Sequence, residues 1–271
     1  LFRQAGLDPD QPPRTWDAIA AAALAIKEKT GKVGLIGPAN SGVSGEGFYQ
    51  GLVLSAGGRV LSEDRTRLTF AEPAAMKVIT TFCAMAEAGT MPAMALNDSM
   101  SGFASGNAGM WLSSSALQAY LVAGAKDKFE LRTTGMPAFG DLPTQPTHSG
   151  SALFIMSDDP VKQRAAWELT KFLTGDHGYT VLTTKIGSLP LRPALVQTPE
   201  MAAWIEANPL IKPNLEQLDR LQPWEPYPGA QYGQIQRILM DAVAEAVYGD
   251  GDPQAVMTDA QTRAQELMPT E

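Results

Sequence analysis

The stretch FASGNAGMWLSSS, at residues 103–115, contains a turn, a strand and a polar tip in immediate succession. Gly106 and Asn107 are turn residues, and the apolar run AGMWL after them predicts a short buried strand. The strand leads directly into three serines. Their hydroxyl and N–H groups are typical of a helix N-cap, and the same groups suit the oxygens of a ligand. Ser114 and Ser115 are therefore candidate binding residues.

Short strands of this kind alternate with helical periodicity along the chain. Residues 33–37 and 152–156 also predict buried strands, because each is a brief apolar run. Residues 16–30 place apolar side chains at the i, i+3, i+4, i+7 spacing of an amphipathic helix. Helices mixed with short buried strands predict an α/β fold. We expect further helices at residues 48–56, from Pro73 with Met76, Ile79, Cys83 and Ala86 facing the core, at 160–174 with Ala165, Leu169, Phe172 and Leu173 facing inward, at 235–246, and from Pro253.

The composition is that of an ordinary globular protein, and it restricts the class of partner. The 271 residues suffice for two lobes or one large α/β domain. The net charge of −8 argues against nucleic acid and anionic membranes as partners, since both favour a basic surface. The single cysteine, Cys83, excludes an internal disulfide, and His148 and His177 are too isolated for a metal site. We expect no metal and no cofactor.

Five segments of the chain, taken in order, carry a family resemblance. They are LFRQAGLDPDQPPRTW at residues 1–16, Gly57-Gly58 with the helix start FAEP, FASGNAGMWLSSS at 103–115, GSALFIMSDDPVKQRAAWELTKFLT at 150–174, and GSLPLRPAL at 187–195 before the closing helices. Together they resemble the extracellular solute-binding proteins that serve carbohydrate importers. The opening segment most resembles the glycerol-3-phosphate-binding branch of that family.

The resemblance implies a periplasmic-binding-protein-like fold with two lobes, a hinge, and mixed sheets flanked by helices. Family members begin with most of a first lobe, which this sequence lacks. Residues 1–149 would form the first part of the second lobe, residues 150–195 would cross back to the first lobe, and residues 196–271 would close the second lobe.

The implied function is the capture of a small molecule by hinge closure and its delivery to the permease of an ABC importer. The resemblance also implies a monomer in the periplasm or outside the cell, with any membrane anchor on residues absent from this sequence.

A cleft for sugars needs aromatic side chains against the apolar faces of the ring and short polar groups for its hydroxyls. Trp224 and Tyr227 lie in a proline-rich stretch that favours no regular helix, so they either wall a cleft or pack their loop against the lobe. Phe48 is a third aromatic candidate. Trp111 lies in a strand pattern that favours a core position.

The polar candidates lie mainly on loops. Glu46 and Asn40, in a Gly/Ser-rich segment, either bind hydroxyls or are solvated. Gly150 matches a position where the resembled family brings its backbone close to the ligand, and His148 suits either a pocket wall or a solvated loop. The serine tip touches ligand in that family, which favours binding by at least one of its serines.

Two substitutions argue against a ligand that carries phosphate. The glycerol-phosphate branch has a tyrosine before its Leu-Pro pair, whereas Ser188 precedes Leu189-Pro190 here. It also has an arginine before its penultimate helix, whereas the loop PGAQYG at residues 228–233 has none. A sugar or polyol is therefore the primary prediction. A glycerol-3-phosphate or glycerophosphodiester ligand is the alternative.

Sequence motifs favour a binding protein over an enzyme. The chain contains no G-x-S-x-G, no P-loop, no H-E-x-x-H and no G-x-G-x-x-G. We therefore expect no catalytic activity. A carbohydrate-active hydrolase remains a further alternative, because its two acids need to meet only in space.

Overall fold

The strands form two small parallel sheets in the computed structural model, which describes residues 1–39, 41–148, 150, 152–190 and 192–269. β1 (Val33–Ile36) pairs with β2 (Ala108–Trp111). β3 (Thr147–His148) pairs with β4 (Gln222–Pro223). Parallel neighbours need a crossover connection, so each sheet joins segments that are distant in sequence. The strands predicted near residues 33 and 108 are confirmed, and both sheets in the described chain are parallel pairs rather than mixed.

α1 (Trp16–Thr30) begins and ends at residues whose chemistry stops a helix. The Thr15 hydroxyl accepts a hydrogen bond from the Ala18 N–H at 3.2 Å. Gly31 takes the left-handed conformation, with φ 68°, and its N–H donates to the Lys27 carbonyl. The predicted helix and its predicted apolar face are confirmed. The buried positions on that face are Ile19, Ala22, Ala23 and Ile26.

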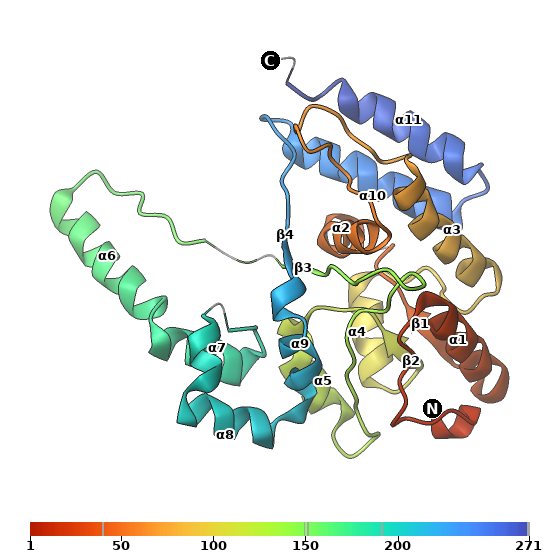
Figure 1. Ribbon diagram of the computed structural model, residues 1–271, viewed down its shortest axis with the longest axis horizontal. Coiled ribbons are helices and arrows are strands. Elements are labelled where there is room, and N and C mark those ends of the chain that lie inside the picture. The colour runs from red at the N-terminus through yellow and green to blue at the C-terminus, as the bar shows by residue number, and fades with distance from the viewer. Residues whose placement is uncertain (40, 149, 151, 191, 270–271) are drawn as a thin grey trace.

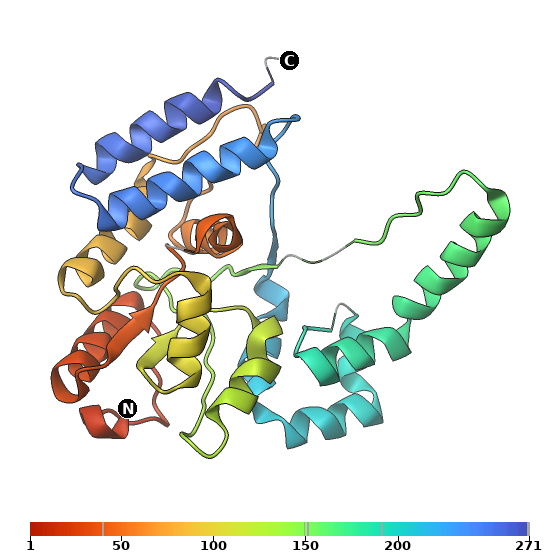
Figure 2. The ribbon, with the colours of Figure 1, turned by 180° about the vertical axis from the view of Figure 1, so that it is seen from behind.

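The main hydrophobic core lies among α1, α2 (Glu46–Ser55), α3 (Pro73–Glu87), α10 (Tyr232–Tyr248) and α11 (Pro253–Gln265). In Figures 1 and 2, α10 and α11 run side by side and α2 lies against this helical layer. The expected apolar face of α10 is buried at Ile235, Leu239, Ala242 and Ala246. This core holds α2 in place, and α2 carries several candidate site residues.

α3 buries a wider arc than the predicted stripe. Val78, Ile79 and Phe82 are fully buried, whereas the predicted core positions other than Ile79 are only partly buried. α3 contacts α2, α10 and α11, so more than one of its faces is covered. The partly buried positions are Met76, Cys83 and Ala86.

The strand predicted at residues 152–156 is wrong, because this segment is exposed and has no regular structure. Phe154 is 80% exposed and Met156 is 88% exposed. A strand needs a neighbour for its N–H and C=O groups, and no described strand pairs with this segment. It instead links the body to an arm that stands out in Figures 1 and 2.

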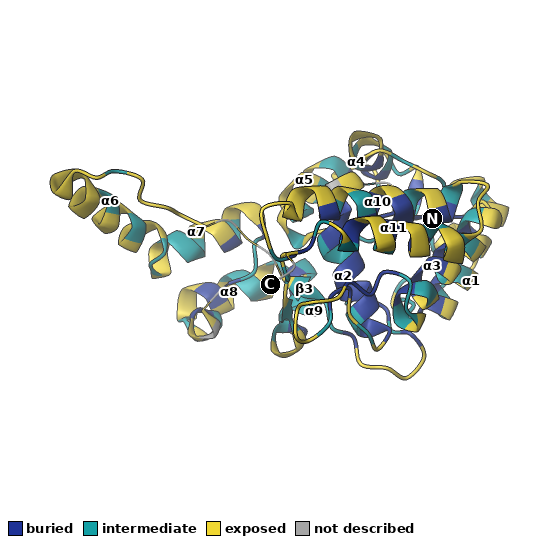
Figure 3. Cartoon of the chain, turned by 90° about the horizontal axis from the view of Figure 1, so that it is seen from above, coloured by how far each residue is buried: buried dark blue, intermediate teal, exposed yellow. Residues whose placement is uncertain are grey.

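The arm consists of α6 (Pro160–Leu173) and α7 (Asp176–Ile186), and α8 (Pro199–Ala207) follows it along the chain. α6 forms as predicted because the Asp159 carboxylate caps its N-terminus, accepting from the Val161 N–H at 2.8 Å. Its apolar face is not inward as expected, since Leu169 is 57% exposed and Phe172 is 60% exposed. Figure 3 shows this contrast between a buried body and an exposed arm.

The remaining helices connect these parts. None of the helices in the described ranges is long and apolar enough to cross a membrane. The other α-helices are α4 (Leu96–Ala104), α5 (Gln118–Ala125) and α9 (Lys212–Leu215), and the 3-10 turns are η1 (Arg3–Ala5), η2 (Gly42–Gly45), η3 (Ser115–Leu117), η4 (Pro193–Gln197), η5 (Pro209–Ile211) and η6 (Leu218–Arg220).

Candidate ligand-binding cleft

A broad open cleft of about 2000 Å³ lies along one side of the body. Its walls come from the residues before α1, the start of α2, the end of β2, residues 128–137, β3, α7, α9 and the loop after β4. Enclosed small-molecule sites usually occupy about 300–1,000 Å³. The described chain therefore forms an open groove with ample space for a ligand.

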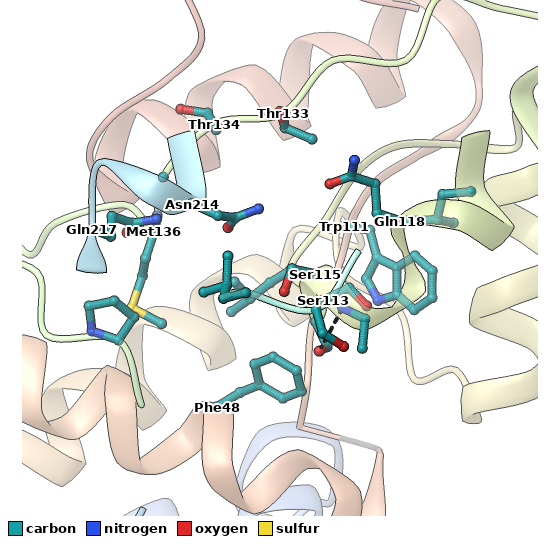
Figure 4. Close-up of a pocket in the computed structure, with 18 of the residues that line it drawn as sticks. Phe48, Trp111, Ser113, Ser115, Gln118, Thr133, Thr134, Met136, Asn214 and Gln217 are labelled. Atoms are coloured by element: carbon teal, nitrogen blue, oxygen red, sulfur yellow. Dashed lines mark hydrogen bonds between the residues drawn. The ribbon is translucent and has the colours of Figure 1, made fainter. Parts of the chain in front are cut away.

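The serine tip after β2 faces this cleft. The Ser114 hydroxyl accepts from the Ala116 N–H at 3.2 Å and so caps η3. Ser113, Ser114 and Ser115 all line the cleft. Figure 4 shows the Phe48 ring extending from α2 toward this tip. The structure thus brings three of the predicted site residues, Phe48, Ser114 and Ser115, to one wall.

Three cleft residues that the sequence analysis did not propose for binding, Trp16, Gln118 and Thr134, carry buried polar atoms without a partner in the described chain. Gln118 Oε1 and Thr134 Oγ1 are buried and accept or donate no hydrogen bond within the described chain. Both residues line the cleft, and Figure 4 places Gln118 beside Trp111 and Thr134 beside Thr133. Buried polar groups are normally satisfied. Unpaired atoms in a cleft wall are therefore candidate contacts for a ligand.

Gln217 stiffens the opposite wall. Its Oε1 accepts from the Met136 N–H at 3.0 Å, and its Nε2 donates to the Pro213 carbonyl at 3.1 Å. A Cβ atom on Gly135 would lie 3.1 Å from Gln217 Cδ, so the backbone passes this side chain without room for a larger residue. The amide of Asn214 lies beside this wall (Figure 4).

Glu46 is the first residue of α2 and has 0% exposed surface, although it borders the cleft. The Tyr227 hydroxyl donates to Glu46 Oε1 at 2.9 Å, and the Trp224 indole Nε1 donates to Glu46 Oε2. Gln50 and Gln236 also donate to this carboxylate. Burial raises the pKa of Glu46 above its ordinary value of 4.5, and the four hydrogen bonds oppose that shift.

The two predicted aromatic residues near Glu46 occupy different positions. Trp224 is partly exposed and lines the cleft, with its ring in an edge contact with Tyr232 at 5.8 Å between centroids. Tyr227 is only 2% exposed and lies in the main core, where it contacts Phe70 edge-on. The structure therefore corrects the expected contact between Tyr227 and ligand. Its hydroxyl supports Glu46 instead.

The remaining candidates lie along the edge of the cleft or outside the described residues. Gly150 and His148 line the cleft near the start of the arm. Trp111 also lines it, is partly buried, and packs against the small core formed by Ile36, Phe103 and Ala108. Asn40 lies outside the described residues, as do Ser149 and Ser151.

The cations in the cleft wall are largely engaged by neighbouring groups. Arg3 and Arg132 both form ion pairs with Glu130, and Arg132 also pairs with Asp10. Lys128 Nζ donates to a backbone carbonyl at 3.2 Å. Within the described chain, no group of three or more His, Cys, Asp or Glu residues is arranged to hold a metal ion.

The sequence profile of the bacterial extracellular solute-binding proteins matches residues 1–213. The chain belongs to this family. The resemblance seen in the five sequence segments is therefore confirmed, and it extends over most of the 271 residues.

A curated relative and two solved structures show which family members are similar. The sn-glycerol-3-phosphate-binding periplasmic protein UgpB of Escherichia coli is 25% identical over 277 residues, which cover 98% of this chain and 63% of that protein. The cyclic α-maltosyl-1,6-maltose binding protein of Arthrobacter globiformis has a TM-score of 0.83 at 22% identity, covering 98% of this chain and 67% of its own. UgpB of Mycobacterium tuberculosis, solved with glycerophosphocholine, has a TM-score of 0.79 at 19% identity, covering 98% and 66%.

These comparisons confirm the predicted fold class, because the similar structures are two-lobed periplasmic binding proteins of the α/β class. The relatives named above are binding proteins rather than enzymes. This chain spans only 63% of the length of UgpB from Escherichia coli.

Of the residues proposed from the sequence, Glu46, Phe48, the serine tip, Gly150 and Trp224 border the cleft, whereas Gln118 and Thr134, which also line it, were not proposed. The residues proposed from the sequence lie next to glycines, prolines or strand ends, which indicate loops in an amino-acid sequence. Glutamine and threonine carry no comparable signal, since only packing decides whether their polar atoms lack partners.

Proposed function

We propose that this chain forms most of the substrate-binding subunit of an ABC importer. The subunit captures a sugar or related polyol in the cleft, closes by hinge bending, and delivers the molecule unchanged to a membrane permease. Preference of the ligand for the closed form drives this closure. The site of action is the periplasm or the outer cell surface, in agreement with an extracellular family and a periplasmic relative.

The observation that carries the ligand class is the combination of aromatic surface with unpaired polar atoms in the same cleft. Phe48 and Trp224 supply rings for the apolar faces of a sugar. Gln118 Oε1 and Thr134 Oγ1 supply buried polar atoms without partners in the described chain. A polyhydroxylated molecule satisfies both kinds of group at once.

Charge favours a neutral ligand over a phosphate ester. Capture of an anion needs a cation whose donors face the ligand. Arg3 and Arg132 of the cleft wall already bind carboxylates, and Arg14 is the one arginine of this wall that forms no ion pair within the described chain. The alternative ligand is a glycerol-3-phosphate or glycerophosphodiester, and the similarity to the two UgpB proteins is the observation in its favour.

The acids of the cleft do not favour a hydrolase. A glycosidase needs two carboxyl groups on either side of the scissile bond. Asp10 and Glu130 are ion-paired with Arg132, and Glu46 is fully buried and hydrogen-bonded. Capture without chemistry remains the function that this arrangement supports best.

We further propose that the arm belongs to the first lobe. Residues 1–149 and 196–271 then form the second lobe, and residues 150–195 cross between the two. The exposed apolar side chains of α6 support this assignment, as they lack a covering layer in the described chain. Their cover is the part of the relatives' length, about a third, that this chain does not match.

A thermal-shift titration of the complete importer subunit tests the proposed ligand class. The panel comprises maltose, ribitol, sn-glycerol 3-phosphate and glycerophosphocholine. At 100 times its Kd, a ligand stabilises the folded state by about 2.7 kcal/mol, which corresponds to a rise in Tm of about 3–5 °C for a chain of this length or longer. A rise with maltose or ribitol supports the proposal. A rise with the phosphate esters alone would establish the alternative, and chromatographic detection of cleaved maltose would establish a hydrolase.

Paired variants connect the ligand to the cleft. Trp224→Ala removes an aromatic wall, so the Kd of the bound sugar should rise about tenfold or more. Tyr120→Ala on α5 removes an aromatic ring that is 43% exposed and lies outside the cleft lining. The control should bind as the wild type does. Equal losses in the two variants would contradict the assigned cleft.

A further inference from the structure

The four donors around Glu46 use its full capacity as an acceptor. Oε1 accepts from the Tyr227 hydroxyl at 2.9 Å and from Gln50 Nε2. Oε2 accepts from the Trp224 indole and from Gln236 Nε2 at 3.5 Å. A carboxylate has about four acceptor sites. None is left for the hydroxyl groups of a solute, and the side chain has no exposed surface with which to meet one.

This carboxylate lies in an unfavourable electrostatic setting. No Lys or Arg of the described chain forms an ion pair with Glu46, and desolvation raises its pKa. The four hydrogen bonds and the position of Glu46 in the first turn of α2, where the helix dipole favours negative charge, compensate in part. Burial of a carboxylate without a counter-ion is costly. A role beyond stability accounts for an acid at this position.

Among the four residues that donate to Glu46, Trp224 is the one whose aromatic ring lines the cleft. Its backbone N–H donates to the His148 carbonyl at 3.0 Å, which fixes the main chain. The edge contact with Tyr232, at an interplanar angle of 71°, limits the tilt of the ring. The indole hydrogen bond to Glu46 then sets the rotation of the ring within the cleft.

The same cluster ties α2 to the strand pair beside the arm. Gln50 Nε2 donates to the Glu225 carbonyl at 2.9 Å, and the Glu225 N–H donates to Gln50 Oε1 at 3.1 Å. Glu225 follows β4, which pairs with β3, and the linker to the arm begins just after β3. The orientation of Trp224 is thus set relative to both α2 and the segment at which the arm begins. Figure 1 shows the strand pair β3 and β4 beside α2.

We propose that Glu46 is a positioning residue that holds the indole of Trp224 in its ligand-binding orientation and does not itself touch the captured solute. This role rests on the proposed function, and it replaces the direct contact that the sequence predicted for Glu46. Affinity then depends on the acceptor geometry of a fully buried acid. Glu46→Gln exchanges one acceptor oxygen for a donor, so at least two of the four donors lose their acceptor.

The orientation of the indole is measured without ligand, on the complete subunit. The chain has five tryptophans, so a ¹H–¹⁵N spectrum shows five indole N–H signals from this part, and the signal lost in Trp224→Phe identifies Trp224. We expect this N–H to exchange slowly with solvent and to exchange at least about tenfold faster in Glu46→Gln, because its charged acceptor is replaced by an amide that offers at most one neutral oxygen. Tyr227→Phe is the matched control, because it removes a donor from the other oxygen and should leave the Trp224 signal slow. An indole signal that is unchanged in Glu46→Gln would overturn the proposal.

The affinity for maltose or ribitol, whichever gives the larger thermal shift, provides the second measurement. Glu46→Gln should weaken binding about tenfold in the wild-type background, and it should have little further effect in Trp224→Phe, since the two residues act through one contact. Equal losses in both backgrounds would show that Glu46 acts independently of Trp224.

If Glu46→Gln does not fold, Glu46→Asp replaces it, as it keeps the charge and withdraws the oxygen from the indole. If neither probe binds the wild type, the proposed ligand class fails, while the exchange of the indole N–H still decides the role of Glu46.

Discussion

Gly51 in α2 and Thr147 in β3 lie in direct contact: a Cβ atom on Gly51 would stand 2.9 Å from the Thr147 backbone nitrogen. The Thr147 hydroxyl also donates to the Gly47 carbonyl one turn earlier in α2. β3, the strand that precedes the arm, therefore packs directly against Gly47 and Gly51 of α2, the helix that carries Glu46 and Phe48.

Gly51→Ala should destabilise the protein by about 1–3 kcal/mol, because the added methyl group forces β3 away from α2. The free energy of unfolding in urea measures this effect. Gly47→Ala is the matched control, since a Cβ atom there meets nothing within 4 Å. Alanine in a helix should then be neutral or raise stability by about 0.5–1 kcal/mol. Similar losses in both variants would contradict the close contact at Gly51.

The sequence predicted the body of the fold well and the arm poorly, for a physical reason. α1 and α10 bury one apolar stripe each, and periodicity reports that directly. The apolar residues 152–156 and the face of α6 have the same kind of pattern, yet they are exposed. A pattern shows that a surface needs a partner, but it does not show whether the same chain supplies it.

Thr134→Val should weaken ligand binding without loss of stability. Thr134 Oγ1 is buried without a partner in the described chain, so removing it relieves an unpaired polar atom in the free protein. The Tm should stay equal or rise, whereas the Kd for the bound sugar should increase about three- to tenfold. Calorimetric titration and thermal unfolding measure the two effects.

Thr183→Val is the control for Thr134→Val, because it changes the stability in the same way without altering a residue of the cleft. Thr183 in α7 is 1% exposed, and its hydroxyl also lacks a partner in the described chain, but Thr183 is not one of the residues that line the cleft. The same stability effect with unchanged affinity is expected. An equal loss of affinity in both variants would remove Thr134 from the site.

The candidate site was predictable only where its residues stand at distinctive sequence features. Phe48 and the serine tip follow a loop and a strand, and both line the cleft. Trp224 and Tyr227 looked equivalent in their proline-rich segment, yet one lines the cleft and the other is buried behind it. The side on which each ring packs depends on Glu46, which lies 178 residues before Trp224.

The linker between body and arm should be the first site of proteolysis in the 271-residue chain. Residues 152–158 have no regular structure, and Phe154 is 80% exposed. Brief chymotrypsin treatment should therefore cut after Phe154, while the 9% exposed Phe103 is spared. In the complete importer subunit, the first lobe should cover this segment and slow the cut about tenfold or more, because cleavage then needs local opening. Equal rates in the two proteins would refute the assignment of the arm to the first lobe.

The buried carboxylate of Glu46 should give the protein a distinctive dependence of stability on pH. Its pKa is raised from 4.5 mainly by desolvation, so between pH 4.5 and the raised value the folded state holds a proton that the unfolded state has lost. In that window the free energy of unfolding contributed by Glu46 falls as pH rises. Tyr227 faces the same carboxylate, but its pKa is raised well above 10.0 and it stays neutral there.

Comparison of the wild type with Glu46→Gln isolates this contribution. The acids with lowered pKa values, which act in the opposite direction, are exposed, are present in both proteins and cancel in the difference; they are Asp64, Glu130 and Glu206. The stability advantage of the wild type over Glu46→Gln should be largest at or below pH 4.5, decline as pH rises through the raised pKa, and level off above it. Urea unfolding of both proteins from pH 4 to pH 8 measures the difference. An advantage that grows with pH would mean that the four hydrogen bonds outweigh desolvation, since the pKa of Glu46 would then be lowered.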